Sequence, residues 1–224
     1  MNLYTFASHA LPADALCGID ASEGTSVDRI ARAIEASGYG EATTHRTAIL
    51  RALGEHLCVQ YTDARKVLQW LATLDRRLAV WGACACAHTA LRYVPAGEHR
   101  PLRAFETTER WLAGAATIEE VRVARERAKA AAAVASAASA YAAYAAATAA
   151  AVAAYAADSA SVAAYAAAYA AAAYTANARA PAWDADAADA AADAAGTTAR
   201  AAELSRLVGV IADALPGIPP EPIQ

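Results

Sequence analysis

Two cysteines and a histidine form the densest group of metal-ligating side chains in the sequence, in the stretch Cys84-Ala-Cys86-Ala-His88. On a helix, Cys84 and His88 share a face because they are four residues apart, whereas Cys86 points away from both. A tetrahedral zinc site needs four ligands, and the nearest further candidate, His99, lies beyond a turn. A cysteine nucleophile needs a base and an orienting acid, for which the spacing gives no evidence. We therefore predict buried thiols at a close helix crossing, with a metal site at Cys84 and His88 as the alternative.

The most acidic run of the chain contains four aspartates: Asp184, Asp186, Asp189 and Asp193. The last three follow one another at helical spacings of three and four, so they share one face. Such a face is commonly solvated, and its first members suit a helix N-terminus. The functional alternative is a patch that steers the association of a basic partner. Asp186, Asp189 and Asp193 are therefore predicted partner-binding residues.

Arg100 is the other candidate for a contact with a partner. It precedes Pro101, a residue that suits the first position of a helix, and Gly114 suits the position just after the last turn. We predict that Arg100 pairs with a carboxylate of this helix, Glu106 or Glu109. A direct contact between Arg100 and a partner is the alternative.

No motif in the sequence indicates catalysis. The chain has no phosphate-binding glycine loop, no GxSxG, no HExxH and no Ser/His/Asp order that suggests a triad. The basic residues between Arg122 and Lys129 are interleaved with Glu126, as is typical of the solvated face of a long helix. We predict a protein that is not an enzyme, without catalytic residues or a cofactor.

The elements that position these residues are predicted to be helices throughout. The chain has 224 residues, enough for one substantial core, and 72 of them are alanines. Alanine is the best intrinsic helix former, and strand formers are scarce. A hydrophobic content of 58%, a charged content of 19% and a net charge of -4 exclude a disordered acidic tail and a strongly basic nucleic-acid binder. The fold class is therefore all-α.

Helix starts and stops divide the chain into about eight or nine helices. The run Thr25-Ser26-Val27-Asp28 and Asp75 each mark a start, and Thr117 forms a capping box with Glu120 that opens the alanine-rich region. Apolar residues at helical spacing predict the core: Val27, Ile30, Ile34, Ile49, Leu50, Leu53, Leu57, Val67, Leu68, Leu71, Leu74, Leu204, Leu207, Val208 and Ile211. Leu102, Phe105 and Leu112 lie along one side of the helix that begins at Pro101, together with Glu109. We predict one bundle over residues 1–215, with a helical N-terminal part (1–75), a middle region (76–180), C-terminal helices (181–215) and a frayed proline-rich tail (216–224).

The alanine-rich region has no charged residue from 130 to 157. This length could span a membrane, but the stretch has no Leu, Ile or Phe, and alanine contributes little to insertion. We predict instead a helical hairpin, divided near Asp158, at the centre of the bundle. Five tyrosines on about a third of the helix circumference are expected to fill gaps in the core, with an aromatic ligand trough as the alternative: Tyr141, Tyr144, Tyr155, Tyr165 and Tyr169.

The chain also lacks signs of export. Residues 1–16 have no Lys or Arg before their apolar residues and no sustained apolar stretch. Four cysteines in a chain of this size do not resemble a disulfide framework. We expect a cytoplasmic protein with reduced thiols.

Residues 81–180 resemble the Imm-5-like immunity proteins. The resemblance depends on Trp81 with the following Cys84-Ala-Cys86-Ala segment, on Arg100-Pro101, and on an Ala-x-Glu helix that ends Trp-x-x-Gly at Gly114. It implies a non-enzymatic, α-helical, cytoplasmic protein that neutralises a toxin or effector by stoichiometric binding to that protein. Two alternatives remain open: a phage or host accessory inhibitor of a defence system, and a small-molecule or metal-binding bundle that uses the tyrosines or the Cys/His face.

Overall fold

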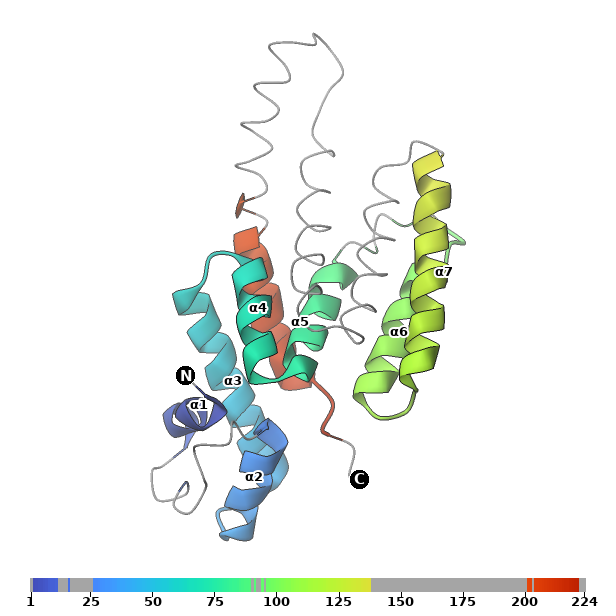
Figure 1. The fold of residues 1–224 in the computed structure, drawn as a ribbon. Coiled ribbons are helices and arrows are strands. Elements are labelled where there is room, and N and C mark those ends of the chain that lie inside the picture. The colour runs from blue at the N-terminus through green and yellow to red at the C-terminus, as the bar shows by residue number, and fades with distance from the viewer. Residues whose placement is uncertain are drawn as a thin grey trace, which may run out of the picture.

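A computed structural model describes residues 2–11, 16, 26–89, 91, 94, 96–137, 201–202 and 204–221. These residues are mostly helical and include no strand, which confirms the all-α prediction (Figure 1). The predicted alanine-rich hairpin, its division near Asp158 and all five tyrosines lie outside the described residues. Only the first part of the alanine-rich region is described, as the end of one long helix.

The helices begin close to the residues that the cap signals indicate. Ser26 accepts a hydrogen bond from the Arg29 N–H, and the Asp75 carboxylate accepts one from Arg77 N–H at 2.8 Å. The helices are α1 (Leu3–Ala10), α2 (Val27–Ala36), α3 (Ala42–Gln60), α4 (Ala64–Leu74), α5 (Arg76–His88), α6 (Arg100–Leu112), α7 (Ile118–Ala137) and the 3-10 helix η4 (Leu215–Gly217). Residues 204–214 are helical too and lead directly into η4.

The first core lies among α1–α5 and the helix over residues 204–214. All the apolar residues predicted to face inward from these helices are buried here except Leu74, which is partly buried and packs against this core. In the predicted stripe of α6, Phe105 and Leu112 are buried, whereas Leu102 is 36% exposed. Two glycines allow the C-terminal helix to approach closely. A Cβ on Gly54 would lie 2.9 Å from the Ala212 carbonyl oxygen, and a Cβ on Gly82 would lie 3.1 Å from Ile211 Cγ2. The two ends of the described chain therefore share one core (Figure 1).

The second core lies among α5, α6 and α7. Its largest side chain is Phe105, which is fully buried together with Ala104 and Val121. Trp81 on α5 packs against both cores, and its indole Nε1–H donates to the Ala214 carbonyl at 2.6 Å. This indole therefore ties α5, which borders both cores, to the C-terminal helix.

The prediction of a frayed tail is wrong for residues 216–221. A nearly buried charge cluster, Asp28, Arg46 and Arg77, holds this segment; the three side chains are 11%, 12% and 16% exposed. Arg46 Nη2 donates to the Ile218 carbonyl at 2.5 Å, and Arg77 Nη2 donates to the Pro219 carbonyl at 2.7 Å. The prolines lack N–H groups and cannot continue a helix, so these carbonyls need donors from elsewhere, and the arginines supply them.

Asp28, the acidic residue of the cluster, binds both arginines and the C-terminal tail. Arg46 Nε lies 2.5 Å from Asp28 Oδ1, Arg77 Nη1 lies 3.4 Å from Asp28 Oδ2, and the Glu221 N–H donates to Asp28 Oδ2 at 2.9 Å. Arg77 Nη2 also donates to the Leu112 carbonyl at the end of α6 at 2.8 Å. One guanidinium thus connects α2, α6 and the C-terminal segment.

Candidate binding groove between α6 and α7

Local signals fix the ends of α6 and α7 that face the turn between them. Gly114 follows α6 with a φ of +73°, a conformation that favours glycine just after a helix. The predicted capping box is present at the start of α7: Thr117 N–H donates to Glu120 Oε2 at 2.7 Å, and Glu120 N–H donates to Thr117 Oγ1 at 3.2 Å. The short turn sets the two helices side by side (Figure 1). Their shared outer face contains a concave surface lined mainly by charged residues.

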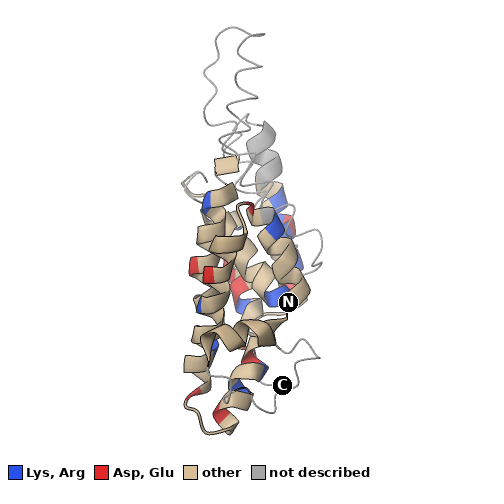
Figure 2. Cartoon of the chain, turned by 90° about the vertical axis from the view of Figure 1, so that its left-hand side faces the viewer, with Lys and Arg blue, Asp and Glu red and all other residues tan. Residues whose placement is uncertain are grey.

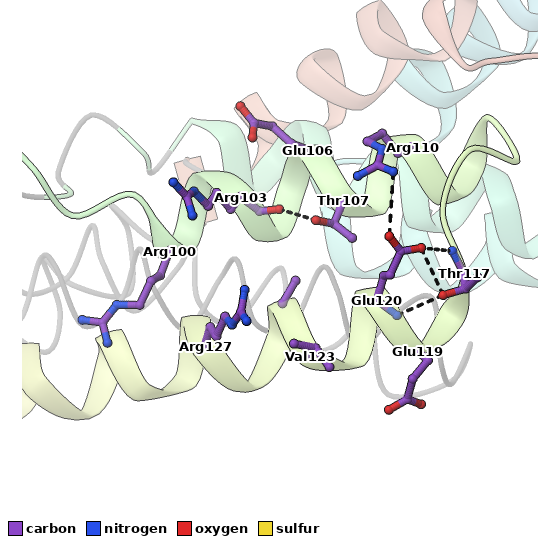
Figure 3. A pocket seen from close by; sticks show the side chains of 11 residues that line it. Arg100, Arg103, Glu106, Thr107, Arg110, Thr117, Glu119, Glu120, Val123 and Arg127 are labelled. Atoms are coloured by element: carbon purple, nitrogen blue, oxygen red, sulfur yellow. Dashed lines mark hydrogen bonds and ion pairs between the residues drawn. The ribbon is translucent and has the colours of Figure 1, made fainter.

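This surface is a groove of about 530 Å³, shown in Figure 3. Four arginines and three glutamates line it, together with two threonines, a valine and an alanine. The charged lining residues are Arg100, Arg103, Arg110, Arg127, Glu106, Glu119 and Glu120. Its size falls within the range typical of ligand sites, about 300–1,000 Å³.

At the end of the groove near the α6–α7 turn, the charges neutralise one another. Arg110 Nη2 lies 3.8 Å from Glu120 Oε1 and donates to the Ala115 carbonyl at 2.9 Å. Hydrogen bonds from the backbone and side chain of Thr117 lower the pKa of Glu120, and Arg110 adds to this effect. Glu119 pairs with Arg122 at 3.4 Å. This end is therefore occupied by its own capping and ion-pair network.

The opposite end of the groove contains Arg100, for which the prediction of the ion-pair partner is wrong. Arg100 pairs with Glu98, with Nε 2.8 Å from Glu98 Oε1, and not with Glu106 or Glu109. Glu98 also accepts the Arg100 backbone N–H at 2.9 Å, so it caps the start of α6 while it binds the guanidinium. Glu106 lies six residues further along the helix, a rise of about 9 Å. The hydrogen bonds from Arg100 lower the pKa of Glu98 to about 2.

Arg103 and Arg127 lie at the same end as Arg100, on α6 and α7 respectively (Figure 3). Both are exposed. Within the part of the chain that the structure describes, no carboxylate lies within ion-pairing distance of either guanidinium. Neither guanidinium is therefore neutralised by a carboxylate of the described residues.

This arginine pair is not among the site residues predicted from the sequence. A signal was present on α6, where Arg100, Arg103, Thr107 and Arg110 follow a helical spacing of three and four and so form one stripe. Arg127 belongs to the basic stretch that is predicted to be a solvated helix face, and it is exposed as expected. What the sequence does not contain is the position of α7 beside that stripe.

Cys84 and Cys86 are both buried, as predicted, and they face different cores. Burial, with a smaller contribution from the Glu109 carboxylate, strongly raises the pKa of the Cys84 thiol. His88 Nε2 lies 3.4 Å from Glu109 Oε1, and its ring centroid lies 4.8 Å from that of Phe105. Because nucleophiles and metal ligands need the thiolate, this environment disfavours both roles for Cys84.

Among the residues described, no three His, Cys, Asp or Glu side chains are grouped in a way that could hold a metal ion. The described helices also include none with the length and apolar character needed to cross a membrane. Asp186, Asp189 and Asp193 lie outside the described residues, so the predicted acidic face stays a prediction.

Searches against protein-family models, curated proteins and solved structures found no match to this chain. The resemblance of residues 81–180 to the Imm-5-like immunity proteins therefore stays a prediction, as does the activity that it implies.

Proposed function

We propose that the protein is a non-enzymatic binding protein of the cytoplasm, which neutralises a protein partner such as a toxin or effector by stoichiometric binding through the α6–α7 groove. The observation that carries this proposal is the pair Arg103 and Arg127, exposed at one end of a groove of about 530 Å³ without a carboxylate partner among the described residues.

Two features of the groove support a contact surface. First, Arg103 and Arg127 form no ion pair with a carboxylate of the described residues, so their guanidinium groups can pair with carboxylates of a partner. Second, the walls are fixed, because Ala104, Phe105 and Val121 are fully buried behind the groove. The helix backbones therefore lose little conformational freedom when a partner binds, and the cost of ordering is confined to the exposed side chains.

The test begins with capture of a partner by the tagged 224-residue chain from cells of its source, followed by purification of that partner. Calorimetry with the two purified proteins measures the affinity and the stoichiometry. We expect a fixed stoichiometry, loss of the partner's activity in proportion to complex formed, and a decrease in affinity of at least about tenfold in R103A/R127A.

The matched control is R29A/R51A, which removes two exposed arginines of α2 and α3 away from the groove. It should change the affinity by less than about twofold, because isolated exposed charges contribute little. Equal affinities of R103A/R127A and the unmodified chain would refute the groove as the contact surface. Turnover of a substrate by the purified protein would refute the proposal as a whole. A captured partner that belongs to a defence system would identify the protein as an accessory inhibitor, with the same binding mode.

A further inference from the structure

We infer that the partner presents an acidic segment of protein chain to the groove, with two carboxylates next to an apolar side chain. This inference rests on the proposed function and adds the chemistry of recognition. The carboxylates pair with Arg103 and Arg127, and the apolar side chain packs on Val123.

The first step is to separate the occupied arginines from the available ones. Glu98 holds Arg100 through both carboxylate oxygens, and Glu120 holds Arg110. Arg103 and Arg127 have no such partner in the described residues, and they approach the same end of the groove from two helices (Figure 3). A guanidinium presents a planar fork of donors that matches a carboxylate in a bidentate pair. Two arginines on two helices therefore suit two carboxylates on one segment.

The second step concerns the class of partner. A nucleic acid needs a basic strip along its phosphate backbone. Here three glutamates line the same groove, and the chain has a net charge of -4. Figure 2 shows basic and acidic residues interspersed on the side of the described helices that faces the viewer. Charge complementarity thus favours a segment with a few carboxylates over a polyphosphate chain.

The third step concerns the middle of the groove, which is apolar. Val123 is 45% exposed there, beside the buried Ala124. An exposed valine between charged lining residues offers an apolar contact of limited size. An aliphatic side chain next to the two carboxylates would cover this valine and exclude water from the neighbouring ion pairs, which strengthens them.

The test uses a fluorescein-labelled synthetic peptide that carries one Glu-Glu-Leu segment between neutral Gly-Ser flanks, so that two carboxylates lie next to one apolar side chain. Anisotropy is measured with the 224-residue chain. We expect saturable binding that weakens as the salt concentration rises from about 50 mM to about 300 mM, because exposed charge pairs are screened. The same peptide with Gln in place of Glu should bind at least about tenfold more weakly.

Substitutions then locate the site. R103E/R127E and the neutral R103Q/R127Q should each weaken peptide binding by at least about tenfold. R29E/R51E, which changes the net charge by the same amount as R103E/R127E, should change binding by less than about twofold. Melting curves by circular dichroism show that each variant is folded. If R103E/R127E does not fold, the affinity of R103Q/R127Q for the peptide is the test of the site.

Three results would overturn the inference: equal binding of the Gln and Glu peptides, equal losses in R103E/R127E and R29E/R51E, or tighter binding of a single-stranded oligonucleotide than of the acidic peptide through the same arginines. Binding experiments with the natural partner distinguish a failure of this inference from a failure of the proposed function. A partner that binds through the groove but is not displaced by the acidic peptide refutes the acidic segment alone. A partner that binds R103A/R127A and the unmodified chain with equal affinity refutes both the acidic segment and the groove as the contact surface.

Discussion

Replacing Asp28 by asparagine should destabilise the whole protein, although Asp28 lies far from the groove in sequence. The substitution keeps the size of the side chain but removes the negative charge that faces Arg46 Nε at 2.5 Å and Arg77 Nη1 at 3.4 Å. It leaves the guanidinium groups of Arg46 and Arg77, 12% and 16% exposed, without the Asp28 carboxylate, although Arg77 keeps its electrostatic attraction to Asp75. The tail is also affected, because Asp28 Oδ2 accepts the Glu221 N–H at 2.9 Å.

The magnitude follows from the burial of the cluster. Removing one partner of a buried ion pair costs about 3–5 kcal/mol. Here the arginines keep their hydrogen bonds to the carbonyls of Ile218, Pro219 and Leu112, so the lower end, about 3 kcal/mol, is expected. For a domain of 150–250 residues each kcal/mol shifts Tm by roughly 2–4 °C, which gives a decrease of roughly 6–12 °C.

The assay is thermal and urea unfolding of D28N beside the unmodified chain, with amide hydrogen exchange at Glu221 as a local measure. D213N is the matched control, because Asp213 is exposed on the C-terminal helix, and it should change stability by less than about 0.5 kcal/mol. A Tm for D28N within about 1 °C of the unmodified chain would show that the cluster does not stabilise the fold. Unchanged protection of the Glu221 amide would show that Asp28 does not hold the tail.

Three further predictions concern packing, pH and thiol reactivity. G54A should destabilise by about 1–3 kcal/mol in urea unfolding, because its Cβ would meet the Ala212 backbone oxygen at 2.9 Å; G82A should cost less, since it meets side-chain ends of Leu68 and Ile211 that can shift. Burial and, to a smaller extent, His9 lower the pKa of His56 below 6.5, so the folded state binds fewer protons at this group than the unfolded chain does. The free energy of unfolding should therefore decrease as the pH falls below 6.5. Urea titrations at several pH values should show a smaller decrease for H56Q than for the unmodified chain. With iodoacetamide at pH 8, peptide mass mapping should find the exposed Cys58 alkylated while the buried Cys84 and Cys86 stay unmodified; rapid alkylation of Cys84 would contradict its raised pKa.

The sequence predicted best those features that depend on neighbours along the chain. The caps at Ser26, Asp75 and Thr117 involve residues at most three positions away, and the core stripes follow from helical periodicity alone. The predicted partner of Arg100 is wrong for a related reason. Helical spacing identifies only carboxylates of the same helix as candidate partners for Arg100. Glu98 lies in the preceding turn, whose conformation helical periodicity does not specify.

The features that the sequence did not predict depend on distant contacts. Arg46 binds the carbonyl of Ile218, 172 residues away, so neither residue carries a local sign that the tail is held. The groove likewise depends on two helices meeting, and the arginine stripe of α6 shows only one of its walls. Proline-rich composition suggested fraying because it excludes a helix, but it does not exclude an extended segment whose carbonyls find donors on other elements.

The first core has a consequence for synthesis on the ribosome. It joins residues 3–86 to residues 204–218, so its N-terminal helices are made before the helix that completes their packing. At about 5–20 residues per second, the synthesis of residues 87–203 takes roughly 6–23 s, during which the apolar faces of α3 and α4 are not covered by the C-terminal helix. The second core, formed by residues 80–128, needs no such delay. Nascent chains interrupted after α7 should therefore contain one completed core and one exposed core, and should be recognised by chaperones and proteases.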